Sequence, residues 1–247
     1  MEWNREKSDL GKKIIKNLYE KGIIKTWQRD NKDGWILVSG IWSPFYIQLR
    51  KIGSHPKLLK DVGYAMGKMI EHECEGNKVL GIAMAGIPIA TAISLARDIP
   101  ACFTRKMEGI RSSDDFKKRV SSYGEHALIE GEINEGDIFV AIDDLVTKFN
   151  SKMIAFEQLK WEAQKRNINV SCNEVAVLID REQGAGKIAQ EFGISLHSLI
   201  PFQSKGLEWL RDHLSKIEYD VISDYLIQPE KYQDPKIRSR LKKNVEY

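Results

Sequence analysis

Two adjacent carboxylates, Asp143 and Asp144, are the residues best suited to chemistry, and they follow an apolar run at residues 138–142. Thr147 and Ser151 come shortly after them, where a helical pattern begins. Carboxylates at the end of a buried parallel strand suit ribose hydroxyls or hydrated Mg²⁺, and hydroxyls with backbone amides at a helix N-terminus suit a phosphate. The pattern is equally typical of a core strand followed by an acidic helix cap, so both interpretations stay open at this point.

The composition is that of a globular protein with a nearly balanced charge. The 247 residues carry a net charge of +3, with 42% hydrophobic and 30% charged side chains. This balance argues against a nucleic-acid partner and fits small anionic ligands. No apolar run reaches the ~18 residues of a membrane span, and the charged N-terminus has no signal-peptide pattern. We therefore expect a cytoplasmic protein that contacts no membrane.

The cysteines and histidines show no spacing typical of a metal centre. Cys74, Cys102 and Cys172 are far apart in the sequence, and no CxxC pair or His-rich segment accompanies them. We expect neither a zinc site nor a disulfide framework, and reduced thiols agree with a cytosolic location. His197, like most of the other histidines, is expected to be a surface or hydrogen-bonded residue rather than a metal ligand.

Hydrophobic periodicity predicts the strands and helices that position these residues. The expected helices cover residues 9–22, 56–72, 89–97, 152–166 and 184–192, and a polar helical segment covers 207–247. The expected strands cover residues 35–38, 45–50, 79–83, 101–105, 138–141, 174–180 and 194–200. Residues 106–136 are expected to form a long mobile loop or hairpin. The alternation predicts an α/β fold whose central parallel sheet has helices on both faces.

Four polar or glycine-containing loops follow successive expected strands, at residues 84–88, 105–106, 143–151 and 180–185. Loops at the carboxyl ends of parallel strands converge on one cleft. Together these loops offer cations for phosphates, carboxylates for hydroxyls and glycine for close backbone approach, which are the groups that a sugar pyrophosphate requires. Arg181 lies between a buried strand and Gly184, so we expect it in the site rather than on the surface.

Six segments resemble the orotate phosphoribosyltransferase family, and the resemblance as a whole covers roughly residues 9–203. They are SGIWSPFYIQLRKIGSHPKLL, GIAMAGIPIATA, TRK at 104–106, YGEHALIEG at 123–131, VAIDDLVTKFNSK and VLIDREQGAGKIAQEFGISLHSL. The resemblance implies a type I phosphoribosyltransferase fold. The expected phosphoribosyltransferase domain covers residues 1–205 and includes an N-terminal hood, and a helical C-terminal extension covers residues 206–247. It also implies transfer of 5-phosphoribosyl from PRPP to orotate, which gives orotidine 5′-monophosphate and pyrophosphate in pyrimidine biosynthesis.

The resemblance implies roles for individual residues. Asp143 and Asp144 would hold the ribose hydroxyls of PRPP and Arg105 and Lys106 would contact its pyrophosphate, so these four are the expected catalytic residues. The other expected PRPP-binding residues are Leu145, Val146, Thr147, Lys148, Phe149, Asn150, Ser151, Ala85 and Gly86. The expected orotate-binding residues are Arg181, Tyr46 and Thr147. Mg²⁺ is the implied cofactor, carried by PRPP without a direct protein ligand, and the implied assembly is a homodimer.

The chain departs from the family pattern at several positions of the expected site. Glycine and small residues of the family's phosphate loop are replaced by Lys148, Phe149 and Asn150. Glycine permits close backbone approach there, whereas Phe149 adds bulk and a Cβ atom. Lysines of the family are replaced at three further positions, which are Val38, Ala85 and Ser121. A non-catalytic or regulatory relative that binds a nucleotide or PRPP is therefore the alternative function.

Overall fold

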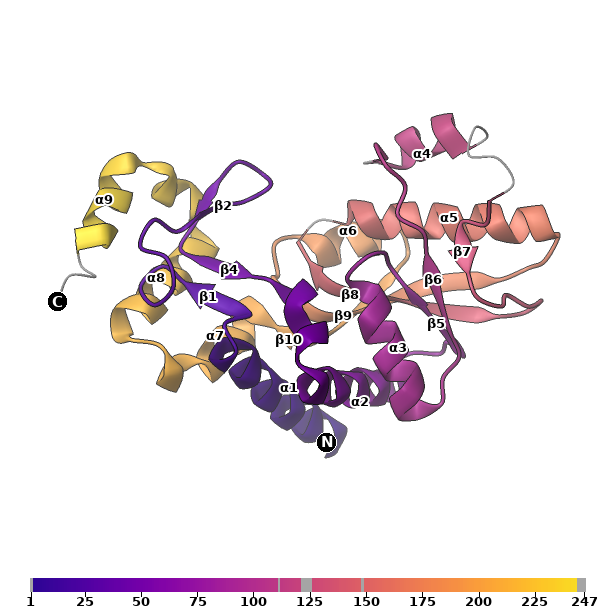
Figure 1. Cartoon of the computed structure of the whole chain (residues 1–247), viewed down its shortest axis with the longest axis horizontal. Helices are drawn as coiled ribbons and strands as arrows, with labels where there is room; N and C mark the ends of the chain where they lie inside the picture. Colours follow the sequence, from indigo (N-terminus) through magenta and orange to yellow (C-terminus); the bar gives the residue numbers. More distant parts are fainter. Residues whose placement is uncertain (1, 111, 121–125, 148, 244–247) are drawn as a thin grey trace.

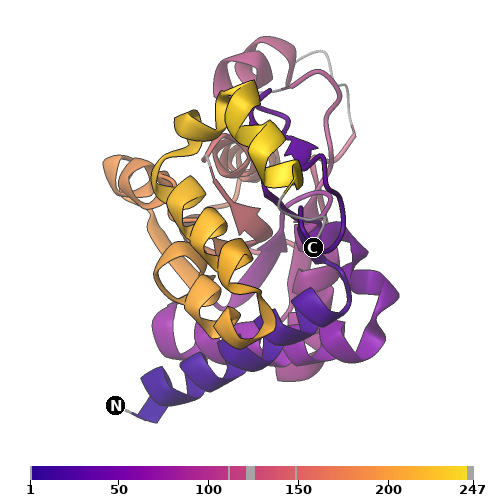
Figure 2. The ribbon, with the colours of Figure 1, turned by 90° about the vertical axis from the view of Figure 1, so that its left-hand side faces the viewer.

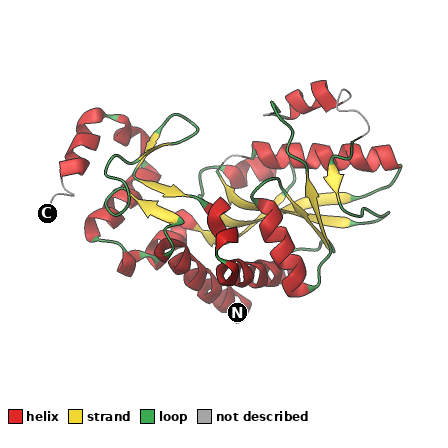
Figure 3. Cartoon of the chain, in the orientation of Figure 1, coloured by secondary structure: helices red, strands yellow, loops and turns green. Residues whose placement is uncertain are grey.

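The computed structural model describes residues 2–110, 112–120, 126–147 and 149–243 as an α/β protein (Figures 1 and 3). A central sheet lies between helices, and a hood of short strands lies beside the C-terminal helices at one end of the molecule (Figure 1). The predicted fold class is confirmed. Of the expected site residues, Lys148 lies outside the described residues, as do Ser121 and the segment 123–125.

The central sheet has the strand order β10–β9–β8–β5–β6–β7. Its strands are β5 (Lys78–Gly81), β6 (Ala101–Thr104), β7 (Ile129–Glu130), β8 (Ile138–Val146), β9 (Ser171–Asp180) and β10 (Ser195–Pro201). Neighbouring strands are parallel except β7, which pairs antiparallel with β6. Both faces of β8 are buried, with Val140 and Ile142 in one hydrophobic cluster and Ala141 in another. Burial on both faces explains why this strand reads as a continuous apolar run.

Helices cover both faces of the sheet, as the sequence predicts. The helices α1 (Glu2–Glu20), α2 (Pro56–Glu73) and α3 (Gly86–Arg97) pack on one face. The helices α5 (Asn150–Arg166) and α6 (Ala185–Glu191) pack on the other face. The inner face of α2 is the expected one, because Val62, Met66 and Met69 are buried at helical spacing.

The segment at residues 106–136 differs from the predicted loop, because its described part contains β7 and the helix α4 (Ser113–Arg119). The Ser112 side chain caps α4 by accepting a hydrogen bond from the backbone N–H of Asp115, at 3.1 Å. Phe116 and Val120, four residues apart, are buried together in a small cluster with Leu128. The prediction missed α4 because charged side chains outnumber apolar ones in this short segment.

The hood consists of two short antiparallel pairs. The strand β1 (Ile24–Thr26) pairs with β4 (Phe45–Ile47), and β2 (Trp35–Ile36) pairs with β3 (Trp42–Ser43). The strand β1 was not predicted, because three residues are too few to show an alternating pattern. A 3₁₀ helix, Leu49–Ser54, then leads from the hood into α2.

The C-terminal extension packs closely on the hood. It contains α7 (Leu207–Trp209), α8 (Lys216–Ile227) and α9 (Pro235–Lys243), with a π turn at Phe202–Gly206 and 3₁₀ turns at Arg211–His213 and Pro229–Gln233. Figure 2 shows the yellow C-terminal helices beside the hood. Tyr225 packs edge-on against Phe45, and the buried Glu218 carboxylate accepts a hydrogen bond from the Thr26 hydroxyl. The predicted boundary between residues 205 and 206 thus falls between segments that share one hydrophobic core. The division into two domains stays a prediction.

Candidate active site

The strand β8 is longer than predicted and carries both carboxylates within it. It runs to Val146, and its register places Asp143 beside Val177 and Val146 beside Asp180 of β9. Asp143 is buried, whereas Asp144 is partly exposed. The carboxylates therefore sit on a rigid central strand near its carboxyl end, which is where ligands bind in sheets of this kind.

A buried lysine pairs with the first carboxylate. Lys152, in the first turn of α5, places its Nζ atom 2.6 Å from Oδ2 of Asp143 and 2.9 Å from the carbonyl oxygen of Leu145. Only 2% of the Lys152 side chain is exposed to solvent. The other Asp143 oxygen, Oδ1, accepts the backbone N–H of Asp144 at 2.9 Å. Asp143 is thus held in place and neutralised by protein groups.

Asp144 differs from its neighbour because it has no basic partner of its own among the described residues. Its Oδ1 atom accepts the backbone N–H of Leu145 at 2.7 Å. Burial, followed by the negative charge of Asp143, raises the pKa of Asp144 to about 7 from an ordinary 3.8. The raised pKa means that the ligand-free protein holds this carboxyl partly protonated near neutral pH.

We expect kcat/KM for PRPP to fall as the pH drops through about 7, because protonation removes the charge with which the family resemblance expects Asp144 to hold the ribose hydroxyls. The same raised pKa makes the ligand-free protein lose stability as pH rises toward 7, since the folded state binds this proton more tightly than the unfolded state. Initial rates measured across pH 5.5–9 test the first expectation, with Asp144→Asn as the control. An acid limb that persists unchanged in this variant would assign the pH dependence to another group.

The phosphate loop between β8 and α5 is anchored by an aromatic residue. Phe149 is the N-cap of α5 and is only 1% exposed, packed in the cluster that includes Val146 and Ala155. Thr147 is partly exposed, and Asn150 and Ser151 form the first exposed positions of α5. The first backbone N–H groups of a helix lack intrahelical partners and favour an anion, so the start of α5 is suited to the expected phosphate.

Replacing Phe149 with leucine is expected to lower the free energy of unfolding by about 1–1.5 kcal/mol, because it removes part of a buried ring. The KM for PRPP should rise as well, since the ring fixes the loop that precedes α5. Urea unfolding and initial rates provide the two measurements. Phe192→Leu is the matched control, because Phe192 is 58% exposed and should change stability by less than ~0.5 kcal/mol.

The expected pyrophosphate loop lies against the end of β8. Gly86 begins α3, and a Cβ atom there would collide with the carbonyl oxygen of Ile142. The backbone N–H of Ala83 donates to the Thr104 hydroxyl at 2.9 Å, which ties this loop to the end of β6. Ala85 is the N-cap of α3. The structure therefore brings together the ends of β5, β6 and β8, as the sequence predicts.

The expected cations at the end of β6 are exposed. Arg105 forms an ion pair with Glu130, with 3.4 Å between Nε and Oε1, and its carbonyl oxygen accepts the Gln158 side-chain amide at 2.8 Å. Lys106 follows it on the surface. Both side chains are long enough to move toward a ligand, and neither is held in a buried contact.

Arg181 is buried at the end of β9, where the hood and the C-terminal extension meet. Its guanidinium carbon lies 4.9 Å from the ring centre of Phe45, and its Nε atom has no hydrogen-bond partner among the described residues. Burial lowers the pKa of this guanidinium, and the neighbouring Tyr225 hydroxyl opposes the shift. A buried cation without an anionic partner is costly, so the site is suited to a planar carboxylate ligand.

Tyr46 lies on the opposite side of the same hood strand. Neighbouring residues of a strand point to opposite faces, and Tyr46 stacks on Trp35 with 6.0 Å between ring centres. No contact recorded for the described residues joins Tyr46 to Arg181. The structure instead places Phe45 and Tyr225 beside Arg181, and these two residues were not predicted.

Lys152 is the other residue of the site that the sequence analysis did not single out. A signal for it exists, because Lys152, Ala155 and Leu159 recur at helical spacing and all three are buried. A lysine on the inner face of a helix requires a carboxylate partner. That requirement, applied to the adjacent Asp143 and Asp144, could have predicted the pair.

Comparisons with known proteins identify the family. No family model matches the chain. The chain is 30% identical over 192 residues to the orotate phosphoribosyltransferase of Methanocaldococcus jannaschii, covering 78% of this chain and 94% of that enzyme. The chain belongs to the orotate phosphoribosyltransferase family. This membership confirms the resemblance found in the sequence.

Longer relatives match as well. The chain is 34% identical over 166 residues to uridine 5′-monophosphate synthase of Bos taurus, covering 67% of this chain and 31% of that protein. The fold resembles that of UMP synthase from Leishmania donovani, with a TM-score of 0.69, 24% identity and coverage of 88% of this chain and 42% of the other. The chain thus spans less than half the length of these synthases. Among its described helices, none is both long and apolar enough to cross a membrane.

Proposed function

We infer that this chain is an orotate phosphoribosyltransferase, a pentosyltransferase that makes orotidine 5′-monophosphate and pyrophosphate from orotate and PRPP. The membership of the family, over nearly the full length of the archaeal enzyme, carries this inference. The buried Arg181, which has no anionic partner among the described residues, supports an acidic base as the acceptor.

In the reaction, a ring nitrogen of orotate forms a bond to C1 of PRPP while the bond from C1 to the pyrophosphate oxygen breaks. The nitrogen loses its proton, and pyrophosphate leaves with the electron pair of the broken bond. Positive charge develops on the ribose ring and negative charge on the leaving group, so catalysis consists largely of holding the ribose and stabilising pyrophosphate.

The described residues suit these tasks. We propose that the Asp144 carboxylate accepts hydrogen bonds from the ribose hydroxyls. Asp143 positions it by accepting the Asp144 backbone N–H and the Lys152 ammonium group. Thr147 and the first amides of α5 would bind the 5′-phosphate. Arg105 and Lys106 would turn toward pyrophosphate, and Arg181 would bind the carboxylate of orotate.

We propose Mg²⁺ as the cofactor, bound chiefly through PRPP. The donor set fits this arrangement, because Asp143 is already paired with Lys152 and Asp144 offers one further carboxylate on β8. Mg²⁺ commonly binds through one or two carboxylates together with substrate phosphates rather than in a cage of protein ligands. When bound, the ion would neutralise charge on the departing pyrophosphate.

A homodimer and a cytoplasmic location belong to the same proposal. The family resemblance implies the dimer, in which a loop of one subunit reaches the site of the other. The three cysteines are free, which agrees with a reducing compartment.

The decisive experiment follows orotate consumption by absorbance after calorimetric titration of the purified chain with PRPP and Mg²⁺. Binding followed by turnover supports the proposed function, and Asp144→Asn should abolish most of the rate. Saturable PRPP binding without turnover would favour the regulatory alternative. Absence of binding at millimolar PRPP would contradict the proposed enzyme and leave only a relative that binds another nucleotide.

A further inference from the structure

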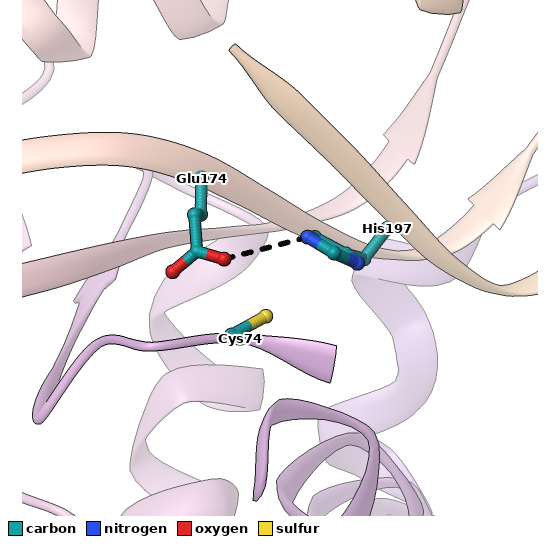
Figure 4. Close-up of side chains that lie close together, drawn as sticks. All are labelled: Cys74, Glu174 and His197. Carbon is teal, nitrogen blue, oxygen red and sulfur yellow. Dashed lines mark ion pairs between the residues drawn. The ribbon is translucent and has the colours of Figure 1, made fainter. Parts of the chain in front are cut away.

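A cluster of three potential metal ligands lies away from the catalytic strand ends. Cys74 follows α2, Glu174 lies near the start of β9 and His197 lies on β10, and Figure 4 shows the three side chains converging. One ligand atom from each residue lies within 4.8 Å of those of the other two. Residues Arg181 and Asp143 belong to the opposite, carboxyl ends of their strands, so this cluster is separate from the proposed active site.

We propose that Cys74, Glu174 and His197 bind a zinc ion, with solvent as the fourth ligand. Thiolate sulfur, imidazole nitrogen and carboxylate oxygen are the three donor types that Zn²⁺ takes in proteins. The spacing of these residues in the sequence gave no indication of such a site, because the three come from different elements.

The distance between two of the ligands suits one shared ion. His197 Nε2 and Glu174 Oε1 are 3.5 Å apart, which is longer than the ~2.9 Å of a good hydrogen bond. Two ligands of a tetrahedral zinc ion at ~2.0–2.1 Å are about 3.3–3.4 Å apart. The Nε2 atom is buried and has no hydrogen-bond partner among the described residues. Its lone pair is therefore available in the direction of the cluster.

A second carboxylate orients the imidazole for this role. Oε2 of Glu73 lies 3.4 Å from Nδ1 of His197. Glu73 itself accepts hydrogen bonds from Nε1 of Trp3 at 2.8 Å and from Nζ of Lys7 at 2.8 and 3.0 Å. A histidine that binds metal usually donates its other N–H to such a carboxylate, which fixes the tautomer. Glu73 thus makes Nε2 the free nitrogen.

The remaining contacts position Glu174 and balance the charge. Oε2 of Glu174 accepts the backbone N–H of Glu75 at 2.9 Å, which leaves Oε1 for the ion. A bulge in β9, where Cys172 and Asn173 face the single residue Phe139 of β8, precedes Glu174 and allows its side chain to point toward α2. The Cys74 thiolate and Glu174 would neutralise Zn²⁺, while Lys7 neutralises Glu73.

An open cavity gives the ion a route to the cluster. It has a volume of about 450 Å³, and its lining includes Glu73 and His197. A bound ion would connect the end of α2 to the edge strand β10 and to its neighbour β9. We therefore expect metal binding to stabilise the fold, and the test does not depend on catalytic turnover.

The test uses the full chain, stripped with a chelator and titrated with Zn²⁺ against a chromophoric competitor. We expect one ion per chain and a rise in melting temperature of about 5–10 °C when free zinc exceeds Kd ~100-fold. Replacement of Zn²⁺ by Co²⁺ should give an absorption band that arises from charge transfer between the Cys74 thiolate and the metal. Cys74→Ser should abolish this band, and Glu73→Gln should weaken zinc binding by about 10- to 100-fold.

Cys172→Ser is the matched control, because Cys172 packs in the hydrophobic clusters on the α5 side of the sheet. It should leave the Co²⁺ band unchanged. Glu174→Gln preserves the side-chain volume. A metal-free melting temperature equal to that of the unsubstituted chain would show that the variant folds normally and has lost only metal binding. A chain that binds no ion at pH 8, or whose band survives in Cys74→Ser, would overturn the proposal and leave His197 as an imidazole between two carboxylates.

Discussion

Replacing Arg181 with methionine is expected to lower kcat/KM for orotate by roughly 30- to 5,000-fold, which corresponds to about 2–5 kcal/mol of lost binding to a buried charge. The guanidinium lies against Phe45 in a buried site, and its Nε atom lacks a hydrogen-bond partner among the described residues. The ligand's carboxylate would replace the missing partner. Kinetics at varied orotate and saturating PRPP measure the effect.

The stability of the same variant provides an independent reading. Methionine removes an uncompensated buried cation, so the free energy of unfolding should stay the same or increase. Arg181→Lys should recover little activity, because an ammonium group lacks the planar pair of donors. The control is Arg211→Met, since the Arg211 side chain is 62% exposed. An Arg181 variant with unchanged orotate kinetics would remove this residue from the base site.

Replacing Lys152 with methionine is expected to lower the free energy of unfolding by about 3–5 kcal/mol, because it leaves the buried Asp143 carboxylate without its cation. The side chains are in contact at 2.6 Å, and 2% of Lys152 and 10% of Asp143 are exposed. Urea unfolding gives the measurement. Lys160→Met, on the exposed side of the same helix, is the matched control and should change stability by less than ~0.5 kcal/mol.

A double variant, Lys152→Met with Asp143→Asn, separates the ion pair from the packing of the lysine. It should recover most of the lost stability, because neither residue then leaves a buried charge. Equal losses in the single and double variants would show that packing, rather than charge, dominates. Activity of the double variant would also show whether Asp144 alone holds the ribose hydroxyls.

Much of the fold could be predicted because its determinants are local or periodic. The central strand β8 is a continuous apolar run up to Asp143, and α2 has apolar residues at helical spacing. Segments with short or charged sequences were predicted less well. The strand β1 is ordered by pairing with β4, and α4 by the burial of Phe116, so both depend on tertiary contacts.

The candidate site shows the same division. The two carboxylates and Arg181 could be predicted, because their positions at strand ends follow from the order of the elements and from the family motif. Phe45 and Tyr225 could not, since they reach Arg181 only after the hood and the extension have packed. The sequence suggested that the bulk of Phe149 would obstruct the phosphate loop. Only the structure shows that its ring is buried in a hydrophobic cluster.

The packing of the extension on the hood has a consequence for the order of events during synthesis. Thr26 contacts Glu218, 192 residues later, and Trp42 exchanges two backbone hydrogen bonds with the side chain of Gln233, 191 residues later. At a synthesis rate of ~5–20 residues per second, about 10–40 s separate the emergence of these partners. During that interval Thr26, Trp42 and Phe45 lack their partners in the extension, so the surroundings of Arg181 are completed only after the extension has been synthesised.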